Sequence, residues 1–541
     1  MNGTKEPPVI SIADEQIVPC RRVALLGWGG AVAVALALYG MTMAPDLVWH
    51  DAGYYQWEAA RLNLVRPGEA VRVHPFFIML AHGLGRIGLW NYAKAASVAS
   101  ALGTALAVAN VWLIVYRLTR RLWPAVLAAL SCMLAHTIWQ QGVQPQTYGW
   151  TNAMISGMIL SAIVYVETAR PRWLMVLFLL GGIGMGIHLM SQLAVVVLGV
   201  WVLARVLCGR TPAWVLPAGV GLWIIGAALF WYVAWLEFQQ TGDWMATVRS
   251  VLLGGWGAAV FNVGSISGML WRSLLMAGLN FPTPVALLGL LGLWRSRRLL
   301  KGTPLALLLG LLLAVYVLFA VRYRVPNQNF FFTPVYLMLA LYLGLGIHAI
   351  GWAERPWPRL VLLVLVLAVI PTYRGISATA RAVGFNLRPD RSMHEIPYRD
   401  VYTYYLEPWQ HTQTGPRRFA EEVLAALPPG ALLLPDTTTS PPLKCLHDIE
   451  GRRPDIRIVD PYDAKFDPNV SRYWYGADNL LPALTREGRR VFVVSDAPFY
   501  VPKWVADHDR LAAEGPIFEV VPAESPTHQS RYGDGAAKGL K

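Results

Sequence analysis

Long apolar runs fill the first two thirds of the chain and decide what it can fold into. Before about residue 375 they recur with lengths of roughly 17 to 24 residues, and a helix of about 20 apolar residues crosses a hydrocarbon core of about 30 Å. Charged residues make up 15% of the 541 residues, against about 25% in soluble globular proteins. The pattern therefore predicts a polytopic α-helical membrane protein.

About eleven segments are predicted to span the membrane. They lie near residues 23–43, 92–116, 122–139, 148–167, 173–189, 190–207, 213–236, 271–294, 303–321, 331–351 and 359–375. A polar tail, 1–22, precedes the first span, which we interpret as an uncleaved signal anchor because further spans follow it. The apolar stretch 76–90 is short and contains His82 and Arg86. It is predicted to lie along the interface as an amphipathic helix within the first external loop, 44–91.

The net charge of +13 is concentrated in short loops between the spans. With 76–90 in the interface, every strongly basic loop falls on one side, as the positive-inside rule requires of the cytoplasmic side. The predicted topology has a cytoplasmic N-terminus and an external C-terminus, and the loop pattern argues against nucleic acid as a partner. The four cysteines lie far apart, so no disulfide framework is predicted.

The composition changes after about residue 385. Helical patterns at 417–427 and 443–450 alternate with short apolar strands at 431–434, 456–459, 491–494 and 517–521. This alternation predicts that 385–541 forms a small external α/β domain with a mostly parallel sheet. No Gly-rich phosphate loop occurs in it, so no nucleotide site is predicted.

Polar residues on the predicted external side stand out against the apolar background. Asp51 follows the first span, His74 opens the interfacial stretch, and His188 ends a later apolar helix. Two polar stretches, 140–146 and 322–328, reach the same side, and we expect all of these to converge on one site. Arg322 and Arg324 lie where positive charge is rare, so they are candidates for a phosphate clamp or, alternatively, for contact with lipid headgroups.

Short motifs follow one another along the chain. They are 51–55 (Asp-Ala-Gly-Tyr-Tyr), 74–76 (His-Pro-Phe), Trp139 with 146–148 (Gln-Thr-Tyr), 184–189 (Gly-Met-Gly-Ile-His-Leu), 325–334 (Val-Pro-Asn-Gln-Asn-Phe-Phe-Phe-Thr-Pro), 429–431, Asp436 and 450–456. With this order the chain resembles the C-type glycosyltransferase superfamily, and more closely the bacterial protein O-mannosyltransferase-like membrane proteins. The likeness extends over nearly the whole chain.

The resemblance implies a C-type bundle and an inverting glycosyltransferase. Such an enzyme would move a sugar, mannose being one candidate, from a polyprenyl-phosphate donor to an external acceptor, either a protein Ser/Thr hydroxyl or an envelope glycan. Asp51 would be the catalytic base, although an aspartate here also suits a helix N-cap. The predicted binding residues for donor or acceptor are His74, Tyr54, Gln146, Tyr148, His188, Arg322, Arg324 and Asn327.

Two of these residues keep an alternative role. His74 can contact the donor phosphate or cap the interfacial helix beside Pro75. His188 at the end of an apolar helix suits packing as well as binding.

Several positions depart from the family pattern. Tyr54 replaces the second acid of the first motif, Gln146 replaces a glutamate, and Asn327 replaces an aspartate. Asp51 is the only motif carboxylate left in the membrane half, which argues against a divalent metal, because a hard cation prefers several carboxylates. We therefore expect no metal and no cofactor beyond the lipid-linked sugar as co-substrate.

Two other functions remain open at this stage. A non-catalytic relative could keep the fold to bind lipid or partners, and the missing carboxylates favour it. A transporter is less well supported, because the candidate site lies at one face and no repeated halves with broken helices at the midplane are recognisable. In each case the predicted location is integral to a membrane, most simply the bacterial inner membrane.

Overall fold

The computed structural model describes residues 21–522 except 67, 255–265, 324, 326, 388–397, 467, 477 and 498–499. Its contacts divide the chain into two compact units. The first contains the described residues within Met1–Val48, Ala52–Leu387 and Arg399–Thr414, and the second those within Trp49–Asp51, Arg388–Tyr398 and Gly415–Lys541. Residues 399–414 thus pack with the helical unit, beyond the domain boundary expected near 385.

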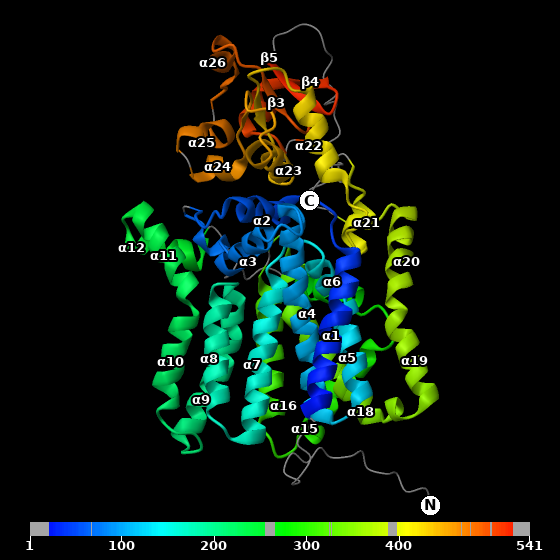
Figure 1. Ribbon diagram of the computed structural model, residues 1–541. Coiled ribbons are helices and arrows are strands. Elements are labelled where there is room, and N and C mark those ends of the chain that lie inside the picture. The colour runs from blue at the N-terminus through cyan, green and yellow to red at the C-terminus, as the bar shows by residue number, and fades with distance from the viewer. Residues whose placement is uncertain are drawn as a thin grey trace, which may run out of the picture. The chain divides into compact units, whose positions relative to one another are not determined.

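The first unit is a bundle of apolar helices (Figure 1). Among the described residues, seven helical segments are long and apolar enough to cross a membrane, and up to nine if each of two bent pairs is one span. The seven are α1 (Arg21–Thr42), α4 (Tyr92–Thr119), α7 (Tyr148–Thr168), η2 (Leu189–Ser191) with α9 (Gln192–Leu207), α16 (Leu305–Arg322), α18 (Thr333–Ile350), and α19 (Pro356–Leu367) with α20 (Val369–Ala382). Nine of the eleven predicted spans thus have a counterpart of sufficient length, and α8 (Arg172–Met185) is a shorter apolar helix.

The prediction of one continuous span at 271–294 is wrong. The structure has two helices there, α14 (Ile266–Asn280) and α15 (Ala286–Leu299), separated by a break that contains Pro282 and Pro284. Proline has no backbone N–H to donate and disfavours the helical conformation of the residue before it, so the helix ends. α15 packs directly on α18, where a Cβ added to Gly292 would lie 1.8 Å from the Tyr342 carbonyl oxygen.

The two bent pairs are α5 (Leu122–Leu134) with α6 (His136–Gly142), at 69°, and α10 (Val215–Gly226) with α11 (Ala228–Thr241), at 58°. At the first break, Asn280 Oδ1 accepts the backbone N–H of Thr137 at 2.8 Å, and the Tyr373 hydroxyl donates to the Leu134 carbonyl at 2.9 Å. A broken helix exposes backbone groups that need partners. Side chains from α14 and α20 supply them here.

The basic loops meet at one end of the bundle. Arg117 and Arg120 at the end of α4 both pair with Glu167 of α7. Arg121 pairs with Glu354 in η4 (Trp352–Glu354), and Arg359 of α19 lies 4.7 Å from the ring centroid of Trp123. The one-sided charge distribution expected from the sequence is therefore present in the fold. Which side of the membrane this end faces stays a prediction.

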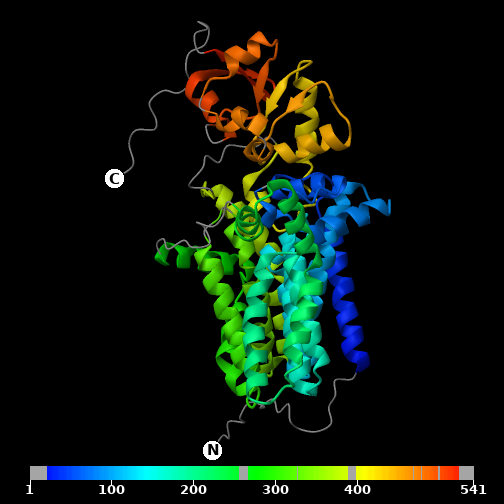
Figure 2. The same cartoon turned by 90° about the vertical axis from the view of Figure 1, so that its left-hand side faces the viewer.

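The opposite end carries short elements from the first loop. Figures 1 and 2 show α2 (His50–Arg61) and α3 (Pro75–Arg86) running across the ends of the bundle helices. At 12 residues α3 is too short to span, and it occupies the place of the predicted interfacial helix. The remaining elements of this unit are η1 (Ala70–Arg72), α12 (Trp244–Leu252), α17 (Gln328–Phe331) and α21 (Val401–Leu406).

The second unit contains a five-stranded sheet in the order β2-β1-β3-β5-β4. β1 (Leu432–Leu434), β2 (Arg457–Ile458) and β3 (Val491–Val493) are parallel, whereas β5 (Ile517–Pro522) is antiparallel to β3 and to β4 (Asp509–Glu514). The predicted strands are present, and β4 was not predicted. The helices are α22 (Gly415–Ala426), α23 (Ser440–Lys444), the π-helix η5 (Cys445–Ile449), α24 (Pro461–Phe466), α25 (Pro468–Tyr475), α26 (Leu481–Arg486) and α27 (Lys503–His508).

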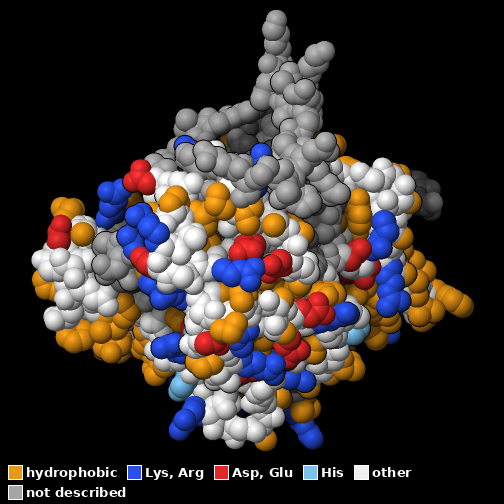
Figure 3. Space-filling model, turned by 90° about the horizontal axis from the view of Figure 1, so that it is seen from above, with side chains coloured by type: hydrophobic (Ala, Val, Ile, Leu, Met, Phe, Trp, Pro, Cys, Tyr) orange, Lys and Arg blue, Asp and Glu red, His pale blue; other side chains and the backbone are white. Residues whose placement is uncertain are grey.

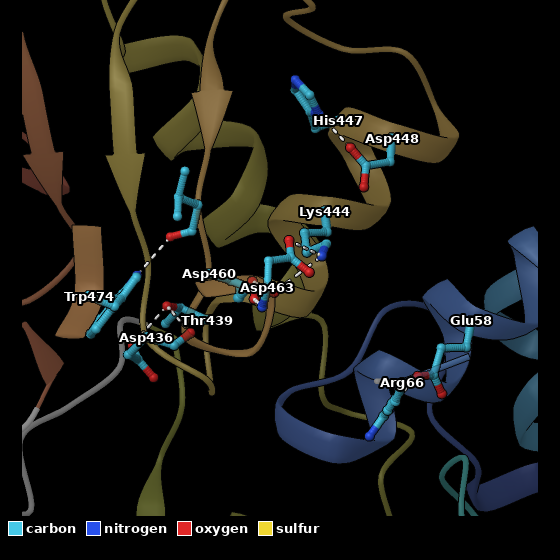
Figure 4. A network of polar contacts seen from close by, with 12 residues as sticks. Glu58, Arg66, Asp436, Thr439, Lys444, His447, Asp448, Asp460, Asp463 and Trp474 are labelled. Atoms are coloured by element: carbon cyan, nitrogen blue, oxygen red, sulfur yellow. Dashed lines mark hydrogen bonds and ion pairs between the residues drawn. The ribbon is translucent and has the colours of Figure 1, made fainter. Parts of the chain in front are cut away.

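A polar network lies at the carboxyl ends of β1 and β2 in this second unit (Figure 4). Asp436 accepts the Thr439 hydroxyl at 2.8 Å, and the buried Lys444 ammonium lies 3.3 Å from Asp460 and 2.7 Å from Asp463. The two carboxylates raise the pKa of Lys444 against the lowering effect of its burial, which is the larger single influence.

Figure 3 shows acidic and basic side chains interspersed on the face seen from above, which is unlike the single-sign surface of a nucleic-acid-binding protein.

Candidate functional site

Asp51 lies in the first turn of α2, directly after His50, whose φ is +65°. A positive φ is strained for a residue with a Cβ and is maintained only when the surroundings require it. Residues 4 and 7 positions further along a helix share the face of the first. Tyr55 and Glu58 therefore continue the face of α2 that Asp51 begins. The Asp51 side chain is 29% exposed, so it remains accessible to a substrate.

His74 and His188 stack on each other beside Tyr55 of α2. Their ring centroids lie 5.3 Å apart at 13°, and Tyr55 meets His74 edge-on at 5.6 Å. The backbone fixes the pair, because the Phe76 N–H donates to the Gly186 carbonyl at 3.2 Å. The structure thus brings together two site residues that the sequence separates by more than a hundred positions.

The hydrogen bonds of the two imidazoles assign their tautomers. His74 Nδ1 lies 2.7 Å from the Ile187 carbonyl oxygen, which can only accept, so Nδ1 carries the proton and Nε2 is left as an acceptor. His188 Nδ1 accepts the Met190 N–H at 3.1 Å, so in the neutral ring Nε2 carries the proton and can donate. The pair therefore offers one acceptor and one donor.

Burial keeps both rings neutral. It lowers the pKa of His188 to about 4. Burial also places the pKa of His74 well below its usual value, and the nearby His188, Arg66 and Arg72 lower it further, against the raising effect of the Ile187 carbonyl. His74 therefore does not act as a cation at neutral pH. Its side chain does not cap the interfacial helix, because His74 is the N-cap residue of α3 without a side-chain hydrogen bond, and its neutral Nε2 can accept a hydrogen bond but not donate one.

Aromatic rings close around the stacked histidines. Tyr148, at the start of α7, lies 5.3 Å from His188 and 5.6 Å from Phe331. Tyr323, just after α16, meets Phe331 edge-on at 4.5 Å. The predicted residue Tyr148 is thus part of the same cluster as His74 and His188. Rings of this kind exclude water and offer faces on which sugar or prenyl groups can pack.

Two arginines near the cluster were not predicted as site residues. Arg66 bonds to the buried Glu58 of α2, as Figure 4 shows, and its guanidinium lies 5.9 Å from the ring centroid of Tyr54. Arg72 pairs with Glu69 at 3.3 Å. Both lie in the predicted external loop 44–91, which also contains Arg61 and Arg86. The reasoning that selected Arg322 and Arg324 applied to them equally and could have identified them.

Residues of α11 and α12 hold the loop that carries these arginines. Glu237, 2% exposed, accepts the backbone N–H of Gly68 at 2.7 Å. Ser250, also 2% exposed, accepts the N–H of Ala70 at 2.9 Å. Burial of Val73 and Ile78 against Phe230 and Val251 adds an apolar contact. Hydrogen bonds to its backbone and apolar contacts of its side chains therefore hold the loop in place between Arg66 and His74.

Of the remaining predicted residues, the structure describes Gln146, Arg322, Asn327 and Tyr54. Gln146 is 4% exposed, and Ser100 Oγ holds its backbone at both N–H, 2.7 Å, and carbonyl, 3.0 Å. Arg322 is the last residue of α16, and Asn327 precedes α17 as its N-cap residue. Arg324 lies outside the described residues. Tyr54 is buried on α2, where Arg66 covers its ring.

Metal ligands were not expected at the site. Within the part of the chain that the structure describes, no group of three or more His, Cys, Asp or Glu side chains could hold a metal ion. Metal independence nevertheless stays a prediction, because only a reaction can test it.

Sequence comparison relates the chain to protein O-mannosyl-transferases. Residues 51–207 match the family model described as the protein O-mannosyl-transferase TMEM260 N-terminal domain. The protein O-mannosyl-transferase TMEM260 of Mus musculus is 22% identical over an alignment of 508 positions, and the alignment covers 86% of this chain and 68% of the mouse protein. The matched segment begins at Asp51 and includes His74, Tyr148 and His188.

Comparison with solved structures relates the fold to ArnT from Cupriavidus metallidurans. The structure bound to undecaprenyl phosphate has a TM-score of 0.53 at 15% identity and covers 91% of this chain and 98% of ArnT. The apo structure gives the same TM-score and identity, with 92% and 98% covered. At this identity the likeness concerns the fold. Together, the comparisons show that the chain is similar in sequence to protein O-mannosyl-transferases and similar in fold to ArnT.

Proposed function

We propose that the protein transfers a sugar from a polyprenyl-phosphate donor to a hydroxyl group outside the membrane. The sugar is a hexose, mannose being the first candidate, and the acceptor is a protein Ser/Thr side chain or an envelope glycan. The reaction takes place at the external side of a membrane, in a bacterium the inner membrane. The observation that carries the proposal is the convergence of the α2 face, His74, Tyr148 and His188 at one end of the bundle.

The proposed chemistry needs one base and one leaving group. Asp51 accepts the proton of the acceptor hydroxyl as its oxygen attacks C1 of the sugar. The bond between C1 and the phosphate oxygen breaks, and its electron pair stays on the polyprenyl phosphate. One carboxylate is enough for this step, so the loss of the other motif acids does not prevent it.

The arginines and histidines have complementary roles in this proposal. Arg66 and Arg72 stabilise the phosphate, on which negative charge builds as the bond to C1 breaks. His188 adds a donor through Nε2, and His74 accepts a sugar hydroxyl through its Nε2. Two supports come from outside the site: the mouse relative, which is named a protein O-mannosyl-transferase, and the ArnT structure with bound undecaprenyl phosphate.

A panel of radiolabelled polyprenyl-phosphate sugars tests the proposal on the purified full chain. We expect turnover with one sugar, and transfer lower by about 10²–10⁴-fold in Asp51→Asn, which keeps the shape but removes the base. Asp46→Asn, in the same loop, is the control and should transfer at the wild-type rate. Turnover should also persist in EDTA.

The outcomes separate the alternatives. Wild-type turnover that Asp51→Asn leaves intact removes Asp51 as the base. Loss of activity in EDTA that Mn²⁺ or Mg²⁺ restores contradicts a metal-free reaction. If no lipid-linked sugar supports turnover although one binds, a non-catalytic lipid-binding protein describes the chain better.

A further inference from the structure

An open groove of about 530 Å³ runs along α20 and α21, apart from the candidate site. It is lined by Thr372, Gly375, Ile376, Thr379, Ala380, Val383, Phe385, Leu387 and Leu406. The six lining residues of α20 and its end are spaced three or four positions apart, so they form one face of the helix. Its volume is in the range of about 300–1,000 Å³ that small-molecule sites occupy.

The groove presents apolar side chains without a described partner to cover them. Val383 is 70% exposed and Phe385 is 56% exposed, although both line the groove. They directly follow α20, which ends the membrane-spanning segment Pro356–Ala382. Only 28% of the apolar window of that segment is buried, so most of the segment faces the surroundings of the bundle. In a membrane those surroundings are hydrocarbon, which makes a lipid chain the natural occupant.

Basic side chains border the groove on α20. Arg374 precedes Gly375 and lies 5.3 Å from the ring centroid of Trp409. Arg381 follows Ala380 and pairs with Asp400 at 2.7 Å. Basic residues next to a lipid-facing groove attract anionic headgroups.

Arg399 provides the independent observation. It is 4% exposed, and its Nε and Nη2 have no hydrogen-bond partner among the described residues. Its guanidinium lies 5.3 Å from Tyr404 and 5.8 Å from Tyr405, the two residues before Leu406 of the groove. A buried guanidinium with unpaired N–H groups is costly, and a phosphate is the group that its fork binds best.

We propose that the groove holds an acyl chain of an anionic glycerophospholipid, whose phosphate binds Arg399 with support from Arg374. The bound lipid would be a permanent component of the fold and not the sugar donor. The groove shares no residue with the cluster of His74, Tyr148 and His188, and its helix is tied instead to α5 and α14 through Tyr373. A free phosphate would leave the apolar lining uncovered.

Photo-crosslinking tests this on the full chain in phosphatidylcholine nanodiscs. The probes are phosphatidylglycerol and phosphatidylcholine with a diazirine in one acyl chain, and adducts are mapped by peptide mass spectrometry. We expect the anionic probe to label residues 372–387 preferentially. Gly375→Leu should abolish this labelling, because a Cβ at Gly375 meets nothing within 4 Å and the added side chain fills the groove. Gly278→Leu, on α14 and equally open, is the control.

Arg399→Gln tests the role of charge. In this variant, labelling by the anionic probe should fall at least about tenfold, which is the factor expected for the loss of one charged hydrogen bond. Arg374→Gln serves if Arg399→Gln does not fold, and it should reduce labelling in the same direction. Equal labelling by both probes, or full labelling of Gly375→Leu, overturns the proposal. So does displacement by undecaprenyl phosphate at lower concentration than by phosphatidylglycerol, which would assign the groove to the carrier lipid.

Discussion

Replacing Glu237 tests whether α11 positions the loop that carries Arg66, Arg72 and His74. Glu237 is 2% exposed and its carboxyl group accepts the Gly68 N–H at 2.7 Å, so leucine at this position removes that hydrogen bond. Loss of a hydrogen bond to a carboxyl group costs about 1–3 kcal/mol, and each 1.36 kcal/mol is a factor of ten in an equilibrium constant. The loop should therefore open roughly 5- to 150-fold more often in Glu237→Leu.

Hydrogen–deuterium exchange measures this opening without assuming any reaction. The amides of Gly68, Ala70 and Val73 should exchange faster by that factor in Glu237→Leu. Glu237→Gln keeps an acceptor oxygen and should stay within about threefold of wild type, since it restores the bond that leucine removes. Glu354→Gln is the control, because this glutamate lies at the opposite end of the bundle and its ion pair with Arg121 is exposed.

A second readout separates positioning from general damage. If the loop presents the phosphate-binding arginines, Glu237→Leu should raise the KM for the lipid-linked sugar and leave kcat almost unchanged at saturation. Unchanged exchange at Gly68 would refute the assigned hydrogen bond. Faster exchange with an unchanged KM would show that the loop is held by Glu237 but does not bind the donor.

Three shorter predictions follow from the same structure. Arg72→Gln should weaken binding of the polyprenyl phosphate at least about tenfold, and Arg322→Ala should do the same if Arg322 belongs to the phosphate clamp. Isothermal titration calorimetry in detergent measures both affinities. An unchanged affinity would remove the substituted residue from the phosphate site. The pKa of His188, lowered by burial to about 4, means that below about pH 6.5 the unfolded chain binds the proton that the folded chain rejects. Stability should therefore fall as the pH drops from about 6.5 to 4, and His188→Asn should reduce this dependence in thermal unfolding scans. Gly346→Leu places a Cβ 1.8 Å from the Leu288 carbonyl oxygen and should lower Tm by separating α15 from α18, whereas Gly310→Leu, with open space, should not.

The length of the apolar runs and the placement of charged residues predicted the helical bundle well, because a membrane allows few kinds of backbone structure. Every backbone polar group in hydrocarbon must be bonded within its own helix, so apolar length maps closely onto helices. The failure at 271–294 has a local cause that was visible in the sequence, since Pro282 and Pro284 interrupt the run. The bends between α5 and α6 and between α10 and α11 were not visible, because neither contains proline at the break and tertiary contacts such as that of Asn280 stabilise them.

Strand β4, which was not predicted, shows where local sequence patterns fail. Its residues 509–514, Asp-Arg-Leu-Ala-Ala-Glu, are mostly helix formers, and pairing with β5 imposes the extended conformation. At the site, motif order indicated His74, Tyr148 and His188, which the structure brings together. Arg66 and Arg72 could have been found as cations of the predicted external loop, whereas Glu237 could not, because a backbone contact between distant segments leaves no local pattern.

The glutamate shared by two arginines at the basic end restricts how the bundle can move. Arg117 and Arg120 tie α4 to α7 through Glu167, and Arg359 on Trp123 ties α19 to α5. Helices tied together at one end can change their spacing only at the other end, as in a hinge. If the proposed lipid-linked donor enters sideways from the bilayer, these ties predict that the helices separate next to α2 and α3 and stay together at Glu167.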